Sequence, residues 1–265
     1  MIDFLEITEG VSPIILSQPH GGARLVGEIA DRLNATGRAL ADTDWHIARL
    51  YEDVHPGVTV VRTHLSRYVI DVNRDPSGDT LYPGQSTTEL CPLSDFDGRP
   101  IYLQGAEPTP DEIAVRRRLY HAPYHAALEA QIARLRARHR QILVYDCHSI
   151  RSEIPRLFPS RLPALNLGTD SGRTVALELQ RIAESLCREV ETADLDWVAN
   201  GRFRGGWTTR QYGRPQAGVH AFQLECAQRV YMDEAPPWTY RTDKAERLRH
   251  VIGELLRQFE RWLRG

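Results

Sequence analysis

The sequence predicts an α/β fold of three layers (α/β/α), in which helices cover both faces of a central mixed, largely parallel sheet. Two observations carry this prediction. Short apolar runs bounded by turn residues are typical of buried strands, and longer stretches with apolar residues at helical spacing are typical of helices. The two kinds of segment alternate along the chain. This alternation favours a parallel sheet whose functional loops gather at the carboxyl ends of the strands.

The expected elements follow in order along the chain. The short, core-like apolar runs predict strands at residues 12–17, 58–62, 142–146, 164–167 and 220–224. The periodic segments predict helices at residues 23–35, 43–53, 110–138, 173–191 and 243–264. Residues 75–105 are rich in Pro, Gly, Ser and Asp and have little periodicity. They predict a long loop at the rim of a functional site.

Length and charge limit the classes of protein to consider. A chain of 265 residues can bury a sizeable core, so one domain spanning residues 1–265 is expected. With 33 Lys and Arg against 35 Asp and Glu, the formal charge is -2, which argues against a nucleic-acid or membrane partner. A small-molecule substrate fits better, and the oligomeric state is left open.

Cysteine usage and the N-terminus bear on the compartment. No CxxC pair joins the four cysteines, so neither a disulfide framework nor a thiolate zinc cluster is expected. The chain shows no secretory leader and no apolar stretch long enough to cross a membrane. We therefore expect a cytoplasmic, soluble protein with reduced thiols.

Two histidines stand at the ends of predicted strands. His20 follows the first strand in a Pro-His-Gly-Gly turn, and His148 follows the buried run that ends at Asp146. Because the carboxyl ends of parallel strands meet at one edge of a sheet, the two imidazoles can converge on one point. Imidazole is the commonest protein ligand for zinc, so these residues predict a metal site.

A catalytic zinc usually has three protein ligands, and a carboxylate is the expected third. Asp42 and Asp44 are both available, although Asp42 stands where it would cap the helix that follows. His46 is a further candidate within the helical pattern. The choice between the two aspartates stays open.

A cluster of arginines flanks a short apolar run at residues 66–75. Arg67 and Arg74 suit bidentate recognition of a carboxylate, and Asn73 can add a neutral hydrogen bond, which indicates an anionic substrate. The alternative is an internal ion-pair network in which Asp71 or Asp75 neutralises the arginines.

Glu225 is a carboxylate near the end of an apolar strand pattern. It could serve as a general base beside a metal-bound water, with its pKa tuned by burial and by the cation. The alternative is a structural carboxylate paired to Arg229.

The ordered set of motifs resembles the N-formylglutamate amidohydrolases, and within them the histidine-utilisation branch. The motifs run from Pro19-His20-Gly21-Gly22, Asp44, Leu50-Tyr51, Ser66-Arg67-Tyr68, Asp71-Val72-Asn73-Arg74-Asp75, Tyr120-His121-Ala122-Pro123-Tyr124-His125 and Asp146-Cys147-His148-Ser149 to Asn166-Leu167-Gly168-Thr169, Gly205-Gly206-Trp207-Thr208-Thr209, Gln223-Leu224-Glu225 and Tyr231-Met232. Each is short, but together they cover nearly the whole chain. A departure is Ser160, near which the family pattern has a glycine.

The resemblance implies a fold and an activity. The family is distantly similar to zinc carboxypeptidases, and it hydrolyses N-formyl-L-glutamate to formate and glutamate, the last step of histidine degradation. Zinc is the expected cofactor, although two imidazoles and a carboxylate would also accept cobalt, manganese or iron. The rivals are a zinc amidase or carboxypeptidase-like hydrolase of another N-acyl amino acid, and a non-catalytic protein that binds an acidic metabolite.

The resemblance also implies roles for individual residues. His20, Asp44 and His148 would bind the metal, and Glu225 would act as the base with Arg67 assisting as a catalytic group. Carboxypeptidases place the acidic ligand three residues after the first histidine, where this chain has Ala23. The resemblance assigns the substrate α-carboxylate to Asn73 and Arg74. For the side-chain carboxylate we expect Arg204 and Arg210, which flank the Gly205-Gly206 turn, and the alternative for either is an ordinary surface arginine.

Overall fold

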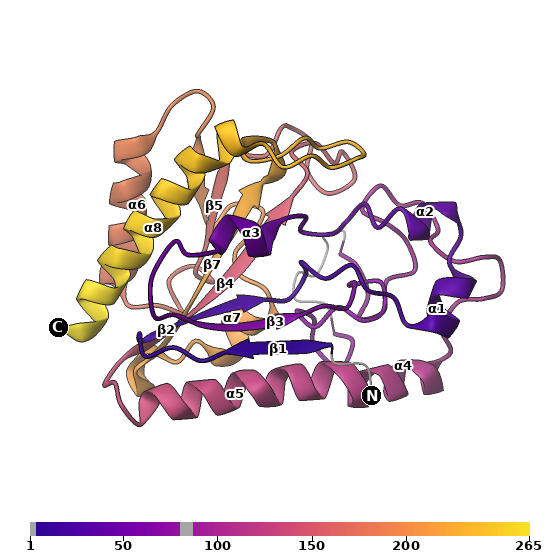
Figure 1. The fold of residues 1–265 in the computed structure, drawn as a ribbon, viewed down its shortest axis with the longest axis horizontal. Coiled ribbons are helices and arrows are strands. Elements are labelled where there is room, and N and C mark those ends of the chain that lie inside the picture. The colour runs from indigo at the N-terminus through magenta and orange to yellow at the C-terminus, as the bar shows by residue number, and fades with distance from the viewer. Residues whose placement is uncertain (1–3, 80–86) are drawn as a thin grey trace.

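A computed structural model describes residues 4–79 and 87–265 of the chain (Figure 1). Within these residues one sheet of seven strands has the order β1-β3-β2-β4-β7-β5-β6. The strands are β1 (Leu5–Thr8), β2 (Ile14–Gln18), β3 (Thr59–Thr63), β4 (Ile142–Ile150), β5 (Leu165–Gly168), β6 (Trp197–Ala199) and β7 (Val219–Ala227). Strands β3, β2, β4 and β7 run parallel to one another, whereas β1 and β5 are antiparallel to their inner neighbours. The predicted mixed, largely parallel sheet is confirmed.

Helices flank this sheet on both faces. They are α1 (Gly27–Arg32), α2 (Ala35–Arg38), α3 (Ile47–Tyr51), α4 (Pro110–Arg116), α5 (Ala122–Arg136), α6 (Leu177–Val190), α7 (Trp207–Tyr212) and α8 (Thr242–Arg264). A π-helical turn, Arg117–His121, joins α4 to α5. Figure 1 shows α5 along one side of the sheet, with α6 and α8 together on the other. Of the helices described, none has the length and apolar character to span a bilayer.

Alternation along the strands divides the core into two layers. Tyr145 of β4 packs toward Phe259 of α8, with ring centroids 6.4 Å apart. Val144, the preceding residue, belongs with Leu128 of α5 to the cluster on the opposite face. Successive strand residues point to opposite faces. Asp146 and His148 therefore share the face of Val144, toward α5.

Several boundaries differ from those predicted. The helix expected at residues 23–35 is interrupted because Leu33 is extended (φ -78°, ψ 137°) and Asn34 caps α2 by accepting from the Gly37 amide. The helix expected at 43–53 is limited to α3, since His46 has a left-handed backbone conformation (φ 61°). Strand β4 continues to Ile150, so His148 lies inside it.

The remaining differences concern short or irregular segments. Strands β1 and β6 are not predicted from the sequence. Between residues 75 and 105 the described part contains no helix or strand, as the composition indicates, and residues 80–86 of that predicted loop lie outside the description. The four cysteines are buried free thiols.

Candidate active site

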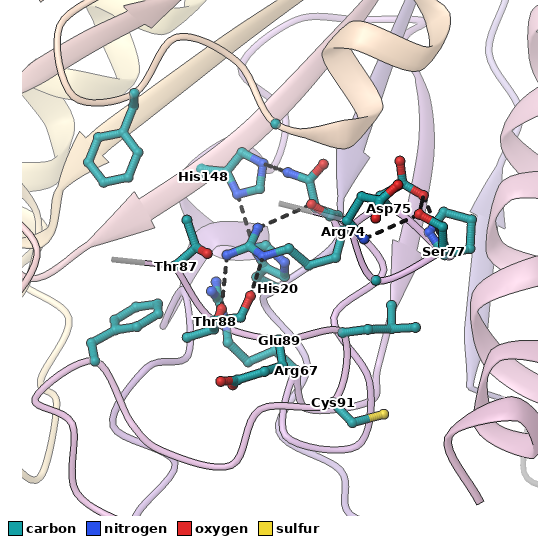
Figure 2. Close-up of a pocket in the computed structure, with 18 of the residues that line it drawn as sticks. His20, Arg67, Arg74, Asp75, Ser77, Thr87, Thr88, Glu89, Cys91 and His148 are labelled. Atoms are coloured by element: carbon teal, nitrogen blue, oxygen red, sulfur yellow. Dashed lines mark hydrogen bonds between the residues drawn. The ribbon is translucent and has the colours of Figure 1, made fainter. Parts of the chain in front are cut away.

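The carboxyl ends of β2, β4 and β7 meet at a cavity of about 440 Å³ (Figure 2). His20, which follows β2, lines it together with His148 of β4 and Glu225 of β7. Loop residues 75–79 and 87–91 line it as well. Its apolar wall contains Leu90, Phe96, Ile113, Ile150, Leu157 and Phe203. The mixture of a few convergent polar groups with apolar walls is typical of a small-molecule site.

His20, Asp44 and His148 form a cluster at the wall of this cavity, in which the two histidines line the cavity and Asp44 lies behind them. One ligand atom from each lies within 4.8 Å of the others, and all three side chains are buried. The Nδ1 atoms of the two histidines are 3.2 Å apart, and Asp44 Oδ2 is 3.3 Å from His148 Nδ1. The Asp44 amide donates to the His20 carbonyl (3.1 Å), which ties the loop carrying the aspartate to the end of β2.

Each imidazole also has a carboxylate behind it. His20 Nε2 donates to Asp71 Oδ1 (2.6 Å), and His148 Nε2 donates to Asp146 Oδ2 (2.9 Å). These contacts hold the ring protons on Nε2. The Nδ1 lone pairs then point toward Asp44, as in metal sites whose histidines are oriented by a second partner.

The electrostatics of the cluster favour a cation. Burial lowers the pKa of His20 to about 4, assisted by Arg67. Burial also lowers the pKa of His148, but Asp146 and Asp44 outweigh it and raise that pKa well above its usual value. Asp44 is deeply buried, which raises its pKa, yet Arg67 and the histidines bring it below the ordinary range. The site is thus rich in carboxylate charge directed at one point.

Glu225 is placed beside His148 by the register of β4 and β7. The two residues are direct partners across this parallel pair, so their side chains share one face. Burial raises the pKa of Glu225 to about 8, partly offset by His148. Its Oε2 accepts a hydrogen bond of 3.3 Å from Gln223 Nε2. A carboxyl that titrates near neutrality can take up and release a proton.

Arg67 and Arg74 both line the cavity. Buried Arg67 donates from Nη2 to Asp44 Oδ1 (2.7 Å) and lies over the ring of Phe96, with its guanidinium carbon 5.0 Å from the centroid. Arg74 donates to the Thr88 hydroxyl (2.9 Å) and carbonyl (3.1 Å), as Figure 2 shows. Asp71 Oδ2 lies 3.9 Å from Arg67 and 3.6 Å from Arg74, so the internal ion-pair network considered from the sequence is present, with both arginines in the wall of the cavity.

Asn73 also lines the cavity, and its amide is held from two sides. Oδ1 accepts from the Thr208 amide at the start of α7 (2.8 Å). Nδ2 is 3.2 Å from Asp146 Oδ2 and 2.9 Å from His148 Nε2. Because that ring nitrogen already donates to Asp146, the Asn73 amide donates to the carboxylate too.

The structure does not bring Arg204 and Arg210 to the cavity. Arg204 is exposed and donates to the Gly201 carbonyl (3.4 Å), and Arg210 pairs with Asp170 (3.2 Å). Arg202, two residues before Arg204 in the same loop, lines the cavity. This residue was not predicted from the sequence, where its only signal is its place beside Arg204.

Asp42 and His46, the further candidates for the metal, lie outside the ligand cluster. Asp42 accepts from the Tyr68 hydroxyl (2.9 Å) and the Phe96 amide (2.8 Å), and burial raises its pKa to about 6. His46 Nε2 contacts the Trp238 carbonyl at 2.6 Å. Both side chains are therefore engaged by structural partners.

Arg229 does not pair with Glu225 as a structural role for that carboxylate would require. Its guanidinium pairs with Asp196 instead (2.9 Å). Neither Arg229 nor Asp196 lines the cavity. Glu225 is thus free of this arginine.

Comparison with known proteins gives a consistent result. A model of the family "N-formylglutamate amidohydrolase" matches residues 12–232. The N-formylglutamate deformylase of Pseudomonas aeruginosa is 43% identical over 263 residues, covering 99% of this chain and 98% of the relative. That of Pseudomonas putida is 40% identical over 259 residues, with coverages of 97% and 96%. The crystal structure of N-formylglutamate amidohydrolase from Ralstonia eutropha JMP134 matches with a TM-score of 0.81 at 24% identity, covering 99% of both chains.

Proposed function

The chain belongs to the N-formylglutamate amidohydrolase family, and from this we propose that it hydrolyses N-formyl-L-glutamate to formate and L-glutamate. The observation that carries the proposal is the cluster of His20, Asp44 and His148 at the wall of a cavity that Glu225 and several arginines also line. The likeness to deformylases covers nearly the full length of both chains. We place the reaction at the end of histidine degradation, following the branch that the sequence motifs resemble.

We propose zinc as the cofactor, bound by His20, Asp44 and His148. The donor set fits, since two carboxylate-backed imidazoles and one carboxylate suit zinc and leave a position open. Cobalt, manganese and iron are chemically acceptable at such a site. A bound zinc would polarise the formyl carbonyl and make water acidic enough to react near neutral pH.

The chain's own groups would manage the proton and the developing charge. Glu225 would take a proton from the attacking water and deliver it to the departing glutamate nitrogen. Arg67 would stabilise negative charge on the formyl oxygen, because its guanidinium is already fixed by Asp44 and needs no reorganisation.

The substrate is a dicarboxylate, so two cationic positions are needed. We assign the α-carboxylate to Arg74, with Asn73 next to it in the cavity wall. The sequence offers Arg204 and Arg210 for the side-chain carboxylate. We assign this role to Arg202 instead, because it is the arginine of that loop that lines the cavity.

The first test is formate release from N-formyl-L-glutamate, with and without a chelator and then with zinc restored. Turnover that the chelator abolishes and zinc restores is the expected result. Faster turnover of N-acetylglutamate or N-formylaspartate would indicate a hydrolase of another acyl amino acid. Binding of N-formylglutamate without formate release by the zinc-loaded protein would indicate a sensor of acidic metabolites.

The second test concerns the two carboxylates. Arg74→Glu should abolish turnover of N-formylglutamate. Arg202→Ala should reduce kcat/KM for N-formylglutamate by about 100-fold but leave N-formylglutamine, which lacks the side-chain charge, nearly unchanged. Arg204→Ala is the matched control, since this arginine is exposed outside the cavity. Equal losses on both substrates would contradict the assignment of Arg202.

A further inference from the structure

Asp71, Asn73 and Arg74 all belong to an irregular segment, residues 69–74, that contains no helix or strand. Residues 69–73 are buried. A buried irregular backbone has no ladder to pair its carbonyls, so it needs partners from elsewhere in the fold. The partners of this segment fix where the three side chains point.

Two histidines that the proposed reaction does not use supply these partners. His125 Nε2 donates to the Val72 carbonyl (2.8 Å), and His121 Nε2 donates to the Arg74 carbonyl (2.9 Å). Both histidines are buried, with exposed fractions of 8% and 3%. The two carbonyls lie on either side of Asn73, so the pair of imidazoles brackets that residue.

The π-helical turn explains how one helix can present these donors. Arg116, five residues before His121, also reaches this segment, donating from Nη1 to the Val69 carbonyl (2.9 Å). In an α-helix a turn takes 3.6 residues, and residues five apart do not share a face. The i→i+5 bonding of the turn Arg117–His121 restores a common face for the two side chains.

His125 has a second contact that joins α5 to α7. Its Nδ1 accepts from the hydroxyl of Tyr212 at the end of α7 (2.8 Å), and the amide of Thr208 in the first turn of α7 donates to Asn73 Oδ1. Only a neutral imidazole protonated at Nε2 can donate to a carbonyl and accept from a hydroxyl at once. The ring therefore connects the two elements that hold Asn73 from opposite sides.

We propose that His121 and His125 are positioning residues, which hold Asn73 and Arg74 in the geometry that substrate binding requires. This inference rests on the proposed function, because it takes Arg74 as the group that meets the substrate carboxylate. Neither histidine lines the cavity, and none of their described contacts is with His20, Asp44 or His148. Their effect should therefore appear in the position of their neighbours.

The kinetic test compares two substitutions of His121. His121→Leu removes the donor, and His121→Gln keeps an amide nitrogen at the position of Nε2. We expect the leucine variant to raise KM for N-formylglutamate by about 10- to 100-fold, because small displacements of positioning groups are costly. The glutamine variant should recover most of this loss, with the zinc content of both variants unchanged.

His139→Leu is the matched control, because His139 Nε2 also contacts a backbone carbonyl, that of Val11 (2.9 Å), away from the cavity. It should leave KM at the wild-type value. Equal KM values for wild type and His121→Leu, or equal losses in the leucine and glutamine variants, would overturn the positioning role.

A spectroscopic measurement separates this proposal from the proposed function. The side-chain amide signal of Asn73 in a ¹H–¹⁵N spectrum can be assigned by its loss in Asn73→Asp. His121→Leu and His125→Leu should shift this signal, while His121→Gln and His139→Leu should not. An unchanged Asn73 signal in both leucine variants would refute the proposal that the two histidines position this residue. If the signal shifts but the wild-type protein does not hydrolyse N-formylglutamate, the positioning role of the histidines is supported and only the proposed function is rejected.

Discussion

Replacing Asp146 by asparagine tests whether the carboxylate behind His148 serves the metal. Asp146 is fully buried, and its oxygens accept from His148 Nε2 (2.9 Å) and Ser17 Oγ (2.8 Å). Asparagine keeps the shape and removes the charge. The hydroxyl of Ser17 lies 2.9 Å from that of Tyr124 and can rotate to donate there, so the fold should tolerate an amide in this place.

The expected effect is on metal affinity. The Asp146 carboxylate raises the pKa of the His148 ring against the effect of burial, and the same charge makes the ring a stronger ligand. Loss of such a partner typically weakens metal binding about 10- to 100-fold, or about 1.4–2.7 kcal/mol. The asparagine oxygen can keep the two donors that Oδ2 now has, His148 Nε2 and Asn73 Nδ2 (3.2 Å), so the loss measured is that of the charge.

The assay is a competition titration of zinc between the protein and a chromophoric chelator at neutral pH. Asp243→Asn is the control, because this exposed aspartate pairs only with Arg241 in the set of ion pairs described. Thermal unfolding of the metal-free proteins checks that the fold is retained. Zinc affinity equal to that of wild type in a folded Asp146→Asn protein would refute the reasoning.

Three further predictions concern the base, a close packing contact and stability. Glu225→Gln should lower kcat for N-formylglutamate by about 10²- to 10⁴-fold, measured at saturating zinc, because the amide cannot accept the proton. Gly206→Ala should lower kcat/KM by about 10-fold or more, since an added Cβ would lie 2.5 Å from Asn73 Nδ2, whose amide is held on both sides. Burial lowers the pKa of His220 to about 4, so the unfolded chain binds a proton that the folded protein does not between the usual value and 4. The contribution of His220 to the free energy of unfolding is therefore fully present above pH 6.5 and is lost as the pH falls, by about 2 kcal/mol between about pH 7 and pH 5. Urea unfolding of the wild type and of His220→Gln at several pH values should show this difference.

Each of these has an outcome that contradicts it. Wild-type turnover by Glu225→Gln would remove that residue from the chemistry. Unchanged kinetics in Gly206→Ala would mean that the Asn73 amide can move aside freely. Parallel pH dependences of unfolding for wild type and His220→Gln would show that this histidine titrates normally in the folded protein.

The sequence was sufficient to predict that the candidate residues at strand ends lie close together. His148 and Glu225 interrupt apolar runs, where a polar side chain has no packing reason to be, and the parallel sheet brings such positions to one edge. His20 follows the same logic. The fold class could be predicted because five of the strands are buried apolar runs, whereas β1 and β6 are short strands at the two edges of the sheet.

The parts that depend on tertiary contacts could not be predicted. Arg202 and Arg204 are equivalent in sequence, and only the path of an irregular loop decides which one lines the cavity. The pairing of Asp71 with His20 joins residues 51 positions apart. The π-helical turn has no apolar periodicity of its own, so the histidine at its end gave no sign of its contact with residue 74.

The register of β4 and β7 fixes His148 and Glu225 relative to each other, whereas the loops that line the cavity can change in length and sequence. The separation of the two residues is set by the spacing of adjacent strands, about 4.8 Å, so the length of the chain between them does not enter into it. Insertions in the connecting loops can reshape the cavity wall and alter which acyl amino acid enters, while the acid and the imidazole stay together. One residue inserted within β4 or β7 would instead turn the downstream side chains of that strand to the other face and separate the two groups. Changes in the loops can therefore alter the cavity wall without separating these two residues.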